Sequence, residues 1–323
     1  MTAANSLSRR EAGTPPSEWT LWYAQPAKVW TDALPVGNGR LGAMVFGGID
    51  EERLQLNEDT LWSGAPREWN NPRASEALAE VRRLVLEEKR YKDADAACRR
   101  MQGPYNESYQ PLGNLYLKFA AVAEASGYRR ELDLDAATAR VRFTAEGVTY
   151  TREVFSSAPD QVIAVRLTAN KHGALNFSVR LDSPLRSSSE AVGKTEISLR
   201  GKAPSHVEPN YVNAPEPVIY DDAEGKGMRF ECRLQLRNKG GKVMAADGGK
   251  LQVAGATEVT ILIAAATGYR GFDQMPSRNA EEIADDCRGR LASAAKKSFE
   301  QLRADPSLAR AAFEEAVRLE SPV

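Results

Sequence analysis

Three short motifs in the sequence contain residue types that can perform chemistry. The first, Gly37-Asn38-Gly39-Arg40-Leu41-Gly42, satisfies the spacing G-x-G-x-x-G. A dinucleotide site needs a buried strand before these glycines and a helix after them, so that the phosphates meet a helix N-terminus. Pro35 stands just before the motif and Gly47-Gly48 would halt a helix soon after it. The sequence therefore predicts a tight turn, in which glycine tolerates positive φ and close backbone approach.

The second motif is Ser205-His206, which lies on a proline-rich segment. Nucleophilic catalysis would need a serine or cysteine activated by a histidine, and the sequence has no G-x-S-x-G elbow. An exposed loop histidine more often contacts a ligand or is solvated than acts as a base. We therefore treat His206 as a candidate contact residue.

The third motif is the acidic pair Glu58-Asp59, beside Asn57 and close to Trp62. Two carboxylates, one acting as acid and one as base or nucleophile, cleave glycosidic bonds. Adjacent residues of an extended strand point to opposite faces, so this pair does not suit one bond. The simpler interpretation is one inward polar contact and one solvated carboxylate, and 44 acidic residues leave no other pair singled out.

Metal and cofactor chemistry has little support in the composition. Cys98, Cys232 and Cys287 are far apart, with no C-x-x-C, and only two histidines are present. These residues predict three free or buried thiols rather than a disulfide framework or a zinc site. We expect no metal and no cofactor.

The overall composition excludes several classes of protein. The chain has 323 residues, 43 Lys and Arg against 44 Asp and Glu, and a formal net charge of −1. Near-neutral charge gives no electrostatic reason to expect nucleic acid as a partner. The sequence contains no run of 18 or more apolar residues, so it predicts no membrane-spanning helix. The length suits a large core, in one big domain or two medium ones.

All five tryptophans, at positions 19, 22, 30, 62 and 69, fall in the first 69 residues. Two interpretations fit this uneven distribution: a shared aromatic core cluster, or rings that stack on flat ligands such as sugars. Either way, the first fifth of the chain differs in role from the rest.

Residues 1–18 are polar and have no apolar stretch, which predicts a flexible arm rather than an intact secretory signal. The elements that must position the candidate residues begin after this segment. Residues 19–66 have short apolar runs and many glycines, as in short strands and loops. A helical insertion is predicted at about 72–102, with Asn71 as N-cap and Pro72 at the first helical position. Its apolar residues recur at three- and four-residue spacing and stop before Gly103.

The period then changes from 3.6 to 2. Strict alternation at Leu175–Leu181 and at Met228–Leu236 predicts half-buried strands. Further strands are predicted at Leu115–Phe119, Arg140–Thr144, Val148–Phe155, Gln161–Thr168, Leu251–Val253 and Val259–Ala266. Consecutive strands without intervening helices indicate a mainly β protein, a large antiparallel β-sandwich over residues 19–279. Residues 280–323 predict a helical linker segment, broken near Pro306.

Five blocks of sequence carry a family resemblance. Leu34–Gly48 (LPVGNGRLGAMVFGG), Gln55–Pro66 (QLNEDTLWSGAP), Tyr109–Leu117 (YQPLGNLYL), Gly201–Tyr211 (GKAPSHVEPNY) and Ala264–Phe272 (AAATGYRGF) follow one another in consistent order. Together they resemble the N-terminal domain of glycoside hydrolase family 95, the α-L-fucosidases. The resemblance covers roughly residues 20 to 300. It implies a super-sandwich with a small helical insertion, a bacterial carbohydrate-processing context and fucosylated glycans as substrates.

The resemblance also implies where catalysis resides. Members of the family hydrolyse with inversion, and their catalytic groups lie in an α/α barrel that follows the sandwich after a helical linker. No catalytic residue of the family corresponds to a position in this sequence, so we expect the chain alone to be inactive, from a truncated, split or remnant gene. A smaller departure is Asn114, where many relatives carry Asp.

The sandwich can still contribute the rim of the site. Candidate substrate-binding residues, all polar or aromatic and on irregular segments, are Asn57, Glu58, Trp62, Tyr109, Gln110 and His206. Inter-domain packing explains them equally well. An apolar surface is expected where the barrel would pack, unless the terminal helices cover it.

Two other functions remain open at this stage: a free-standing carbohydrate-binding module that uses the tryptophan-rich segment, and a subunit that works with a separately encoded barrel. The compartment is not determined by the sequence. Members of the family are often exported, whereas a polar N-terminus and unpaired cysteines are typical of the cytoplasm.

Overall fold

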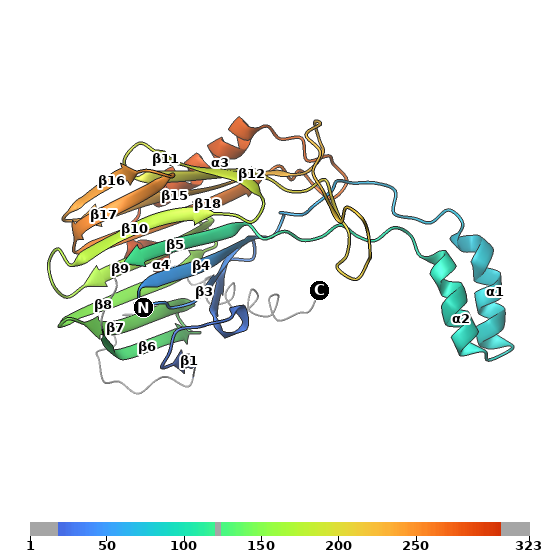
Figure 1. The fold of residues 1–323 in the computed structure, drawn as a ribbon, viewed down its shortest axis with the longest axis horizontal. Coiled ribbons are helices and arrows are strands. Elements are labelled where there is room, and N and C mark those ends of the chain that lie inside the picture. The colour runs from blue at the N-terminus through green and yellow to red at the C-terminus, as the bar shows by residue number, and fades with distance from the viewer. Residues whose placement is uncertain (1–18, 120–123, 305–323) are drawn as a thin grey trace, which may run out of the picture.

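The protein is described by a computed structural model that covers residues 19–119 and 124–304. The predicted arm at 1–18, the end of the predicted linker from residue 305 and its break at Pro306 lie outside the described residues. Within them, the fold is the predicted antiparallel β-sandwich with few helices (Figure 1).

The larger sheet, called sheet A, has nine strands. Their order is β1 (Thr20–Tyr23), β6 (Ala125–Asp133), β7 (Thr138–Ala145), β8 (Val148–Ser157), β9 (Val162–Ala169), β18 (Glu258–Thr267), β15 (Arg229–Lys239), β12 (Glu196–Lys202) and β11 (Arg186–Val192). Every neighbouring pair is antiparallel. The long meander from β6 to β9 forms one half of the sheet, and strands from later in the chain complete it.

The smaller sheet, called sheet B, has seven strands. Their order is β16 (Lys242–Ala246), β17 (Lys250–Ala256), β10 (Leu175–Asp182), β5 (Gly113–Phe119), β4 (Glu51–Glu58), β3 (Leu41–Val45) and β2 (Leu34–Gly37). β5 joins β4 to β10, although these two strands are more than 100 residues apart in the sequence. A separate two-stranded ribbon is formed by β13 (His206–Val207) and β14 (Val218–Ile219).

The core lies between the two sheets and follows from alternation along each strand. In β4, for example, the residues from Glu52 to Glu58 alternate between buried and half-buried, and Leu54 and Leu56 face inward. One buried ion pair crosses this core, from Arg152 of β8 to Glu52 of β4 at 2.9 Å. Burial raises the pKa of Glu52, and the Arg152 guanidinium opposes that rise.

The eight predicted strand segments are all strands in the structure, and the predicted turn between Gly37 and Gly42 connects β2 to β3, with Gly39 at φ +86°. The local patterns did not reveal β6, β11, β12, β13, β14 and β16, and they indicated β1 to β4 only as short strands somewhere within residues 19–66. In β1, β11 and β16 most residues are exposed or half-buried, so no apolar alternation marks them. They are strands because a neighbouring strand supplies hydrogen bonds.

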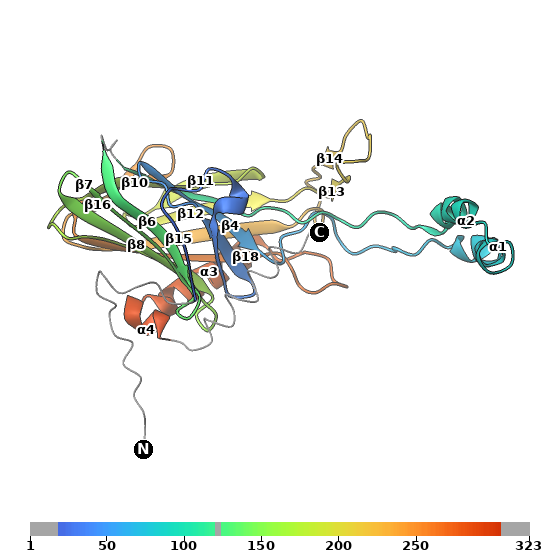
Figure 2. The same ribbon diagram turned by 90° about the horizontal axis from the view of Figure 1, so that it is seen from below.

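The helical insertion forms a hairpin of α1 (Ala74–Leu86) and α2 (Tyr91–Cys98), followed by the short η2 (Arg99–Met101). Figures 1 and 2 show it at the end of two extended segments, well away from the sheets. The prediction of Asn71 as N-cap and of Pro72 as the first helical residue was wrong: α1 begins at Ala74, after Arg73, which makes no side-chain cap. The Asn71 amide instead donates to the carbonyl groups of Arg100 and Gln102, at 2.8 and 2.9 Å, and closes the base of the hairpin.

Two helices near the end of the described chain pack on the outer face of sheet A. α3 (Ala280–Ala294) places Ile283, Cys287 and Leu291 against apolar residues of β9 and β18, and α4 (Phe299–Arg303) continues this cluster. Each helix begins with a capping box, at Asn279 and at Ser298. The first break in this helical segment therefore comes between Ala294 and Phe299, earlier than the predicted break near Pro306.

Candidate functional site

All six candidate residues lie at one end of the sandwich, called here the loop end (residues 57–73, 102–112, 203–228 and 268–279). Backbone hydrogen bonds join three of its segments: Ser63 N donates to Ser108 O at 2.9 Å, and Gly64 N donates to Pro204 O at 3.1 Å. Within this frame the candidates form two clusters. Their assembly at one end is a finding of the tertiary structure, while their role at a sugar stays a prediction.

The first cluster is built around Tyr109 and Trp62. The Tyr109 hydroxyl donates to the side-chain oxygen of Asn57 and lies 2.9 Å from the carbonyl oxygen of Glu58. The Trp62 indole N–H donates to the carbonyl of Asp59 at 3.0 Å, and its ring meets Tyr109 edge to face with centroids 5.3 Å apart. Trp62 is 38% exposed, so a fixed indole is presented to the outside.

Glu58 is directed inward and organises the end of β4. Its carboxylate lies 2.9 Å from Arg40 Nη1 and accepts hydrogen bonds from the backbone and hydroxyl of Thr60, at 2.9 and 2.7 Å. Burial raises the pKa of Glu58 in spite of these partners. Neighbouring Asp59 lies in the turn that follows β4 and is half-buried, with its Oδ1 shielded from solvent, so the expectation of a solvated carboxylate was wrong. The buried Glu58 carboxylate therefore holds Arg40 and Thr60 in place at the loop end.

The second cluster holds His206 between two carboxylates. Its Nδ1 lies 3.1 Å from Glu107 Oε1 and its Nε2 lies 3.1 Å from Glu208 Oε1. These two hydrogen bonds, to Glu208 and Glu107, raise the pKa of His206. Ser63 donates to Glu107 rather than to the histidine. The arrangement favours a fixed imidazolium that donates hydrogen bonds, and it does not suit a general base beside a nucleophile.

Gln110 joins the two clusters from the inside. It is buried, its backbone N–H donates to Leu61 O at 2.9 Å, and its side chain donates to Ser108 O at 3.1 Å. Glu107, which was not among the predicted site residues, is the residue that both His206 and Ser63 contact. Nothing in the sequence distinguishes it among 44 acidic residues, because its partner His206 is 99 positions away.

The loop end also carries many of the exposed large apolar side chains of the described chain. They are Trp62, Tyr105, Tyr211, Val218, Ile219, Tyr269, Phe272 and Met275, with Phe272 87% exposed. Such a gathering of exposed aromatic and aliphatic side chains marks an interaction surface. The two helices that follow β18 cover sheet A instead and leave this surface open (Figure 1).

The tryptophans do not form a core cluster, so that interpretation of their distribution was wrong. Trp19, Trp22, Trp30 and Trp62 are 38–58% exposed, and Trp69 is half-buried. Trp22 lies against Arg129, whose guanidinium is 4.8 Å from the ring centroid, and Trp69 lies against Arg67 at 4.2 Å. Rings held by cations at the surface remain accessible for stacking.

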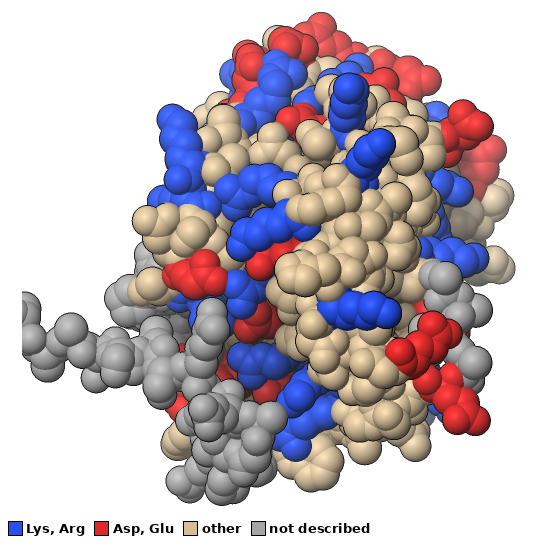
Figure 3. All heavy atoms as spheres, turned by 90° about the vertical axis from the view of Figure 1, so that its left-hand side faces the viewer, with Lys and Arg blue, Asp and Glu red and all other residues tan. Residues whose placement is uncertain are grey.

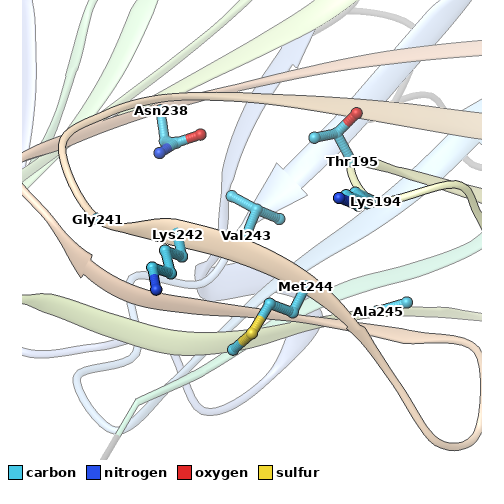
Figure 4. Close-up of a pocket in the computed structure, with 8 residues that line it drawn as sticks. All are labelled: Lys194, Thr195, Asn238, Gly241, Lys242, Val243, Met244 and Ala245. Atoms are coloured by element: carbon cyan, nitrogen blue, oxygen red, sulfur yellow. The ribbon is translucent and has the colours of Figure 1, made fainter.

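The opposite end of the sandwich has a hollow of about 580 Å³, lined by Lys194, Thr195, Asn238 and residues 241–245. Figure 4 shows Val243 on one side of β16, with Lys242 and Met244 on the other, and Figure 3 shows many Lys and Arg side chains on this end. The lining contains neither a carboxylate nor an aromatic ring. It therefore lacks the groups that cleave or stack on sugars.

Within the part of the chain that the structure describes, no three His, Cys, Asp or Glu side chains are grouped as metal ligands. The three cysteines are free thiols, as predicted, with Cys232 and Cys287 buried and Cys98 exposed. None of the described helices combines the length and the apolar character needed to cross a bilayer.

Comparisons with known proteins point to one family. The sequence model for the domain described as "Glycosyl hydrolase family 65, N-terminal domain" matches residues 21–272. A curated relative, "Alpha-L-fucosidase 2" of Arabidopsis thaliana, is 40% identical over 294 residues, which are 88% of this chain and 34% of that protein. The expected resemblance to the N-terminal domain of a fucosidase-like glycosidase is thus confirmed.

Two fungal relatives match over a shorter stretch. "Probable alpha-fucosidase A" of Aspergillus niger is 37% identical over 161 residues, which are 47% of this chain and 20% of that protein. The protein of the same name from Aspergillus oryzae is 33% identical over 161 residues, which are 46% of this chain and 22% of that protein. The chain thus spans about a third or less of the length of the curated relatives it matches.

Proposed function

The chain belongs to the family described as glycosyl hydrolase family 65, N-terminal domain, and from this premise we propose that it is the accessory sandwich of a fucosidase-like glycoside hydrolase. In this proposal it acts on fucosylated glycans together with a catalytic barrel and does not hydrolyse them alone. The observation that carries the proposal is the 40% identity to "Alpha-L-fucosidase 2" over 88% of this chain.

The loop end is the surface that we assign to the barrel. Its exposed apolar side chains, Phe272 and Tyr211 foremost, are costly in water and gain by burial against a second domain. The α1–α2 hairpin supports the same assignment. Its buried apolar cluster is Leu84, Ala94 and Ala97, with half-buried Val81 against it, which is a small core for two helices that stand clear of the sheets (Figure 2). Contact with a barrel would supply the missing packing.

Trp62 and His206 are the residues we place at the rim of the sugar site. An exposed indole fixed by Tyr109 suits stacking on a sugar ring. Both ring nitrogens of His206 face carboxylates, so the imidazolium would contact a sugar with its ring and orient Glu107 and Glu208 to accept hydrogen bonds from sugar hydroxyls. Asn57, Glu58, Tyr109 and Gln110 then act as the support that positions these two groups. The proposal thus divides the six candidates into contact residues and positioning residues.

A chimera tests this function. The chain replaces the matching third of the Arabidopsis relative, and hydrolysis of 2′-fucosyllactose is measured for the chain alone, the chimera and the intact relative. We expect no hydrolysis by the chain alone and hydrolysis by the chimera. In the chimera, Trp62→Ala should raise KM by roughly tenfold, and His206→Asn should raise it less, since stacking contributes on the order of 1 kcal/mol or more.

Trp22→Ala is the matched control for Trp62→Ala, because Trp22 is 52% exposed but belongs to β1 rather than to the loop end. It should leave KM and kcat unchanged. Hydrolysis by the chain alone would overturn the requirement for a barrel. Unchanged KM and kcat in both Trp62→Ala and His206→Asn would overturn the rim assignment.

The exposed tryptophans favour a second candidate function, a carbohydrate-binding module. Calorimetric titration of the chain with 2′-fucosyllactose separates it from the first. Binding that Trp22→Ala abolishes would support the module, and a flat response would leave only the accessory role.

A further inference from the structure

A polar groove lies on the outer face of sheet B, next to the loop end but not part of it. The strand register places six side chains there in two rows across β4, β5 and β10. One row is Arg53, Tyr116 and Arg180, and the other is Gln55, Asn114 and Asp182. The groove has a volume of about 350 Å³, and Pro111 and Pro184 lie at its loop-end side.

The side chains in the groove hold one another in place. Arg53 Nε donates to Asn114 Oδ1 at 2.9 Å, and Asn114 Nδ2 donates to Asp182 Oδ1 at 2.9 Å. Arg180 forms an ion pair with Asp182 and stacks on Tyr116, with its guanidinium 3.7 Å from the ring centroid. Asn114 is only 8% exposed. A ligand would therefore meet groups that are already ordered, which lowers the entropy lost on binding.

The charges in this groove do not balance. Asp182 neutralises Arg180, whereas Arg53 forms no ion pair with a carboxylate among the residues that the structure describes. Its guanidinium is instead placed 5.1 Å from the Phe46 ring centroid and 5.9 Å from that of Tyr116. The groove thus has one uncompensated positive charge. A planar guanidinium with free donors binds a planar carboxylate through two parallel hydrogen bonds.

Gln55 adds an amide to this side of the groove. Its side chain makes no hydrogen bond within the described part of the chain, and it lies across from Asn114 in the register. A free amide beside a guanidinium suits a ligand that has hydroxyl groups next to a carboxylate. A doubly charged phosphate suits the groove less than a singly charged carboxylate does, because Asp182 repels the larger negative charge more strongly.

We propose that this groove binds an acidic saccharide, with the carboxylate of a uronic acid residue on Arg53 and a neighbouring hydroxyl on Gln55. The saccharide class rests on the proposed function, while the preference for a carboxylate rests on the unpaired charge of Arg53. The site is separate from the rim residues Trp62 and His206. It would hold a glycan chain at a point other than the bond to be cleaved.

Calorimetric titration of the full chain tests this proposal, with tetragalacturonate as the probe and its fully methyl-esterified form as the neutral counterpart. We expect the acid to bind at least roughly tenfold more tightly than the ester, which is the effect of one charge-assisted hydrogen-bond pair. Arg53→Gln should weaken binding of the acid by a similar factor. Arg129→Gln, which also removes a guanidinium from an aromatic ring but on sheet A, should leave binding unchanged.

Asp182→Asn sharpens the test because it should act in the opposite direction. It removes the negative charge that neutralises Arg180 but keeps an oxygen for Asn114, so the acid should bind several-fold more tightly. No binding of the acid, equal binding of acid and ester, or an unchanged affinity in Arg53→Gln would each overturn the proposal. Competition by equimolar inorganic phosphate would also overturn it, by showing a general anion site. The fucosidase chimera does not depend on these outcomes.

Discussion

The outer faces of the two sheets differ in what covers them, and their side chains differ accordingly. On sheet A, α3 and α4 bury an apolar cluster, and the ion pairs of Glu153 lie beside it. On sheet B, the described helices do not pack over β4, β5 and β10, and the side chains there are planar and hydrogen-bonding. The difference shows that the outer face of a strand is apolar where another part of the chain packs on it. It is polar where water or a ligand contacts it.

The largest effect is expected at the helix that covers sheet A. Leu291 of α3 is 2% exposed, so Leu291→Ala should lower the free energy of unfolding by about 2–5 kcal/mol through lost burial and a cavity. Leu86→Ala in α1 is the matched control, because Leu86 is 72% exposed, and it should change stability by no more than about 0.5 kcal/mol. Urea denaturation of both variants checks this. Equal effects would mean that α3 is not part of the core.

An intermediate effect is expected at the ion pairs of sheet A. Burial opposes ionisation of Glu153, but Arg166, 2.6 Å away, and Arg140 outweigh it and hold the pKa of Glu153 below its usual value of 4.5. The carboxylate therefore stabilises the fold above the pKa of the unfolded chain, and this contribution is lost as the pH falls through the lower, folded pKa.

Glu153→Gln should accordingly cost about 1.5–3 kcal/mol at pH 7 and progressively less toward pH 3. Unfolding free energies of the variant and the unsubstituted chain, measured from pH 7 to pH 3, should converge at the acidic end. A difference that is constant across this range would show that the carboxylate contributes shape rather than charge.

The smallest effect is expected for a pair of glutamines, one on each outer face. Gln235 of sheet A donates to Glu196 at 3.0 Å, so Gln235→Ala should cost about 1 kcal/mol. Gln55→Ala, on the open groove of sheet B, should change stability by no more than about 0.5 kcal/mol. Thermal and urea denaturation measure both. A larger loss at Gln55 than at Gln235 would mean that the groove serves the fold rather than a ligand.

Local patterns were enough to predict much of the sandwich. Alternation identified β10 because one face of the strand is buried and the other is at least partly accessible to water. It also identified β15, although the prediction of a half-buried strand was wrong there: Glu231 and Arg233 on the outer face are buried as well, next to α3. The same rule fails for β11, where both faces are exposed or half-buried, and for β1, where Leu21 and Trp22 are both exposed. Such edge strands owe their structure to one hydrogen-bonded neighbour, and their own residues do not identify that neighbour.

The candidate site was predictable to a smaller extent. The resemblance singled out Trp62, Tyr109 and His206, and the structure brings them to one end. It also shows that Glu58 faces inward to Arg40, a distinction that its type and neighbours did not make. Glu107 and the groove around Arg53 were missed entirely, because each depends on residues from distant strands or loops.

The sequence by itself determined the mainly β character of this protein, the turn at Gly39, the helical insertion and the resemblance to the N-terminal domain of a fucosidase-like glycosidase. All of these depend on residues that are near one another in the chain. The tertiary structure alone decided that His206 meets Glu107, that α3 covers sheet A, and that Arg53 lies beside Gln55 and donates to Asn114. Those contacts are set by strand register and by packing between sheets, which join residues far apart in sequence through burial rather than through local periodicity.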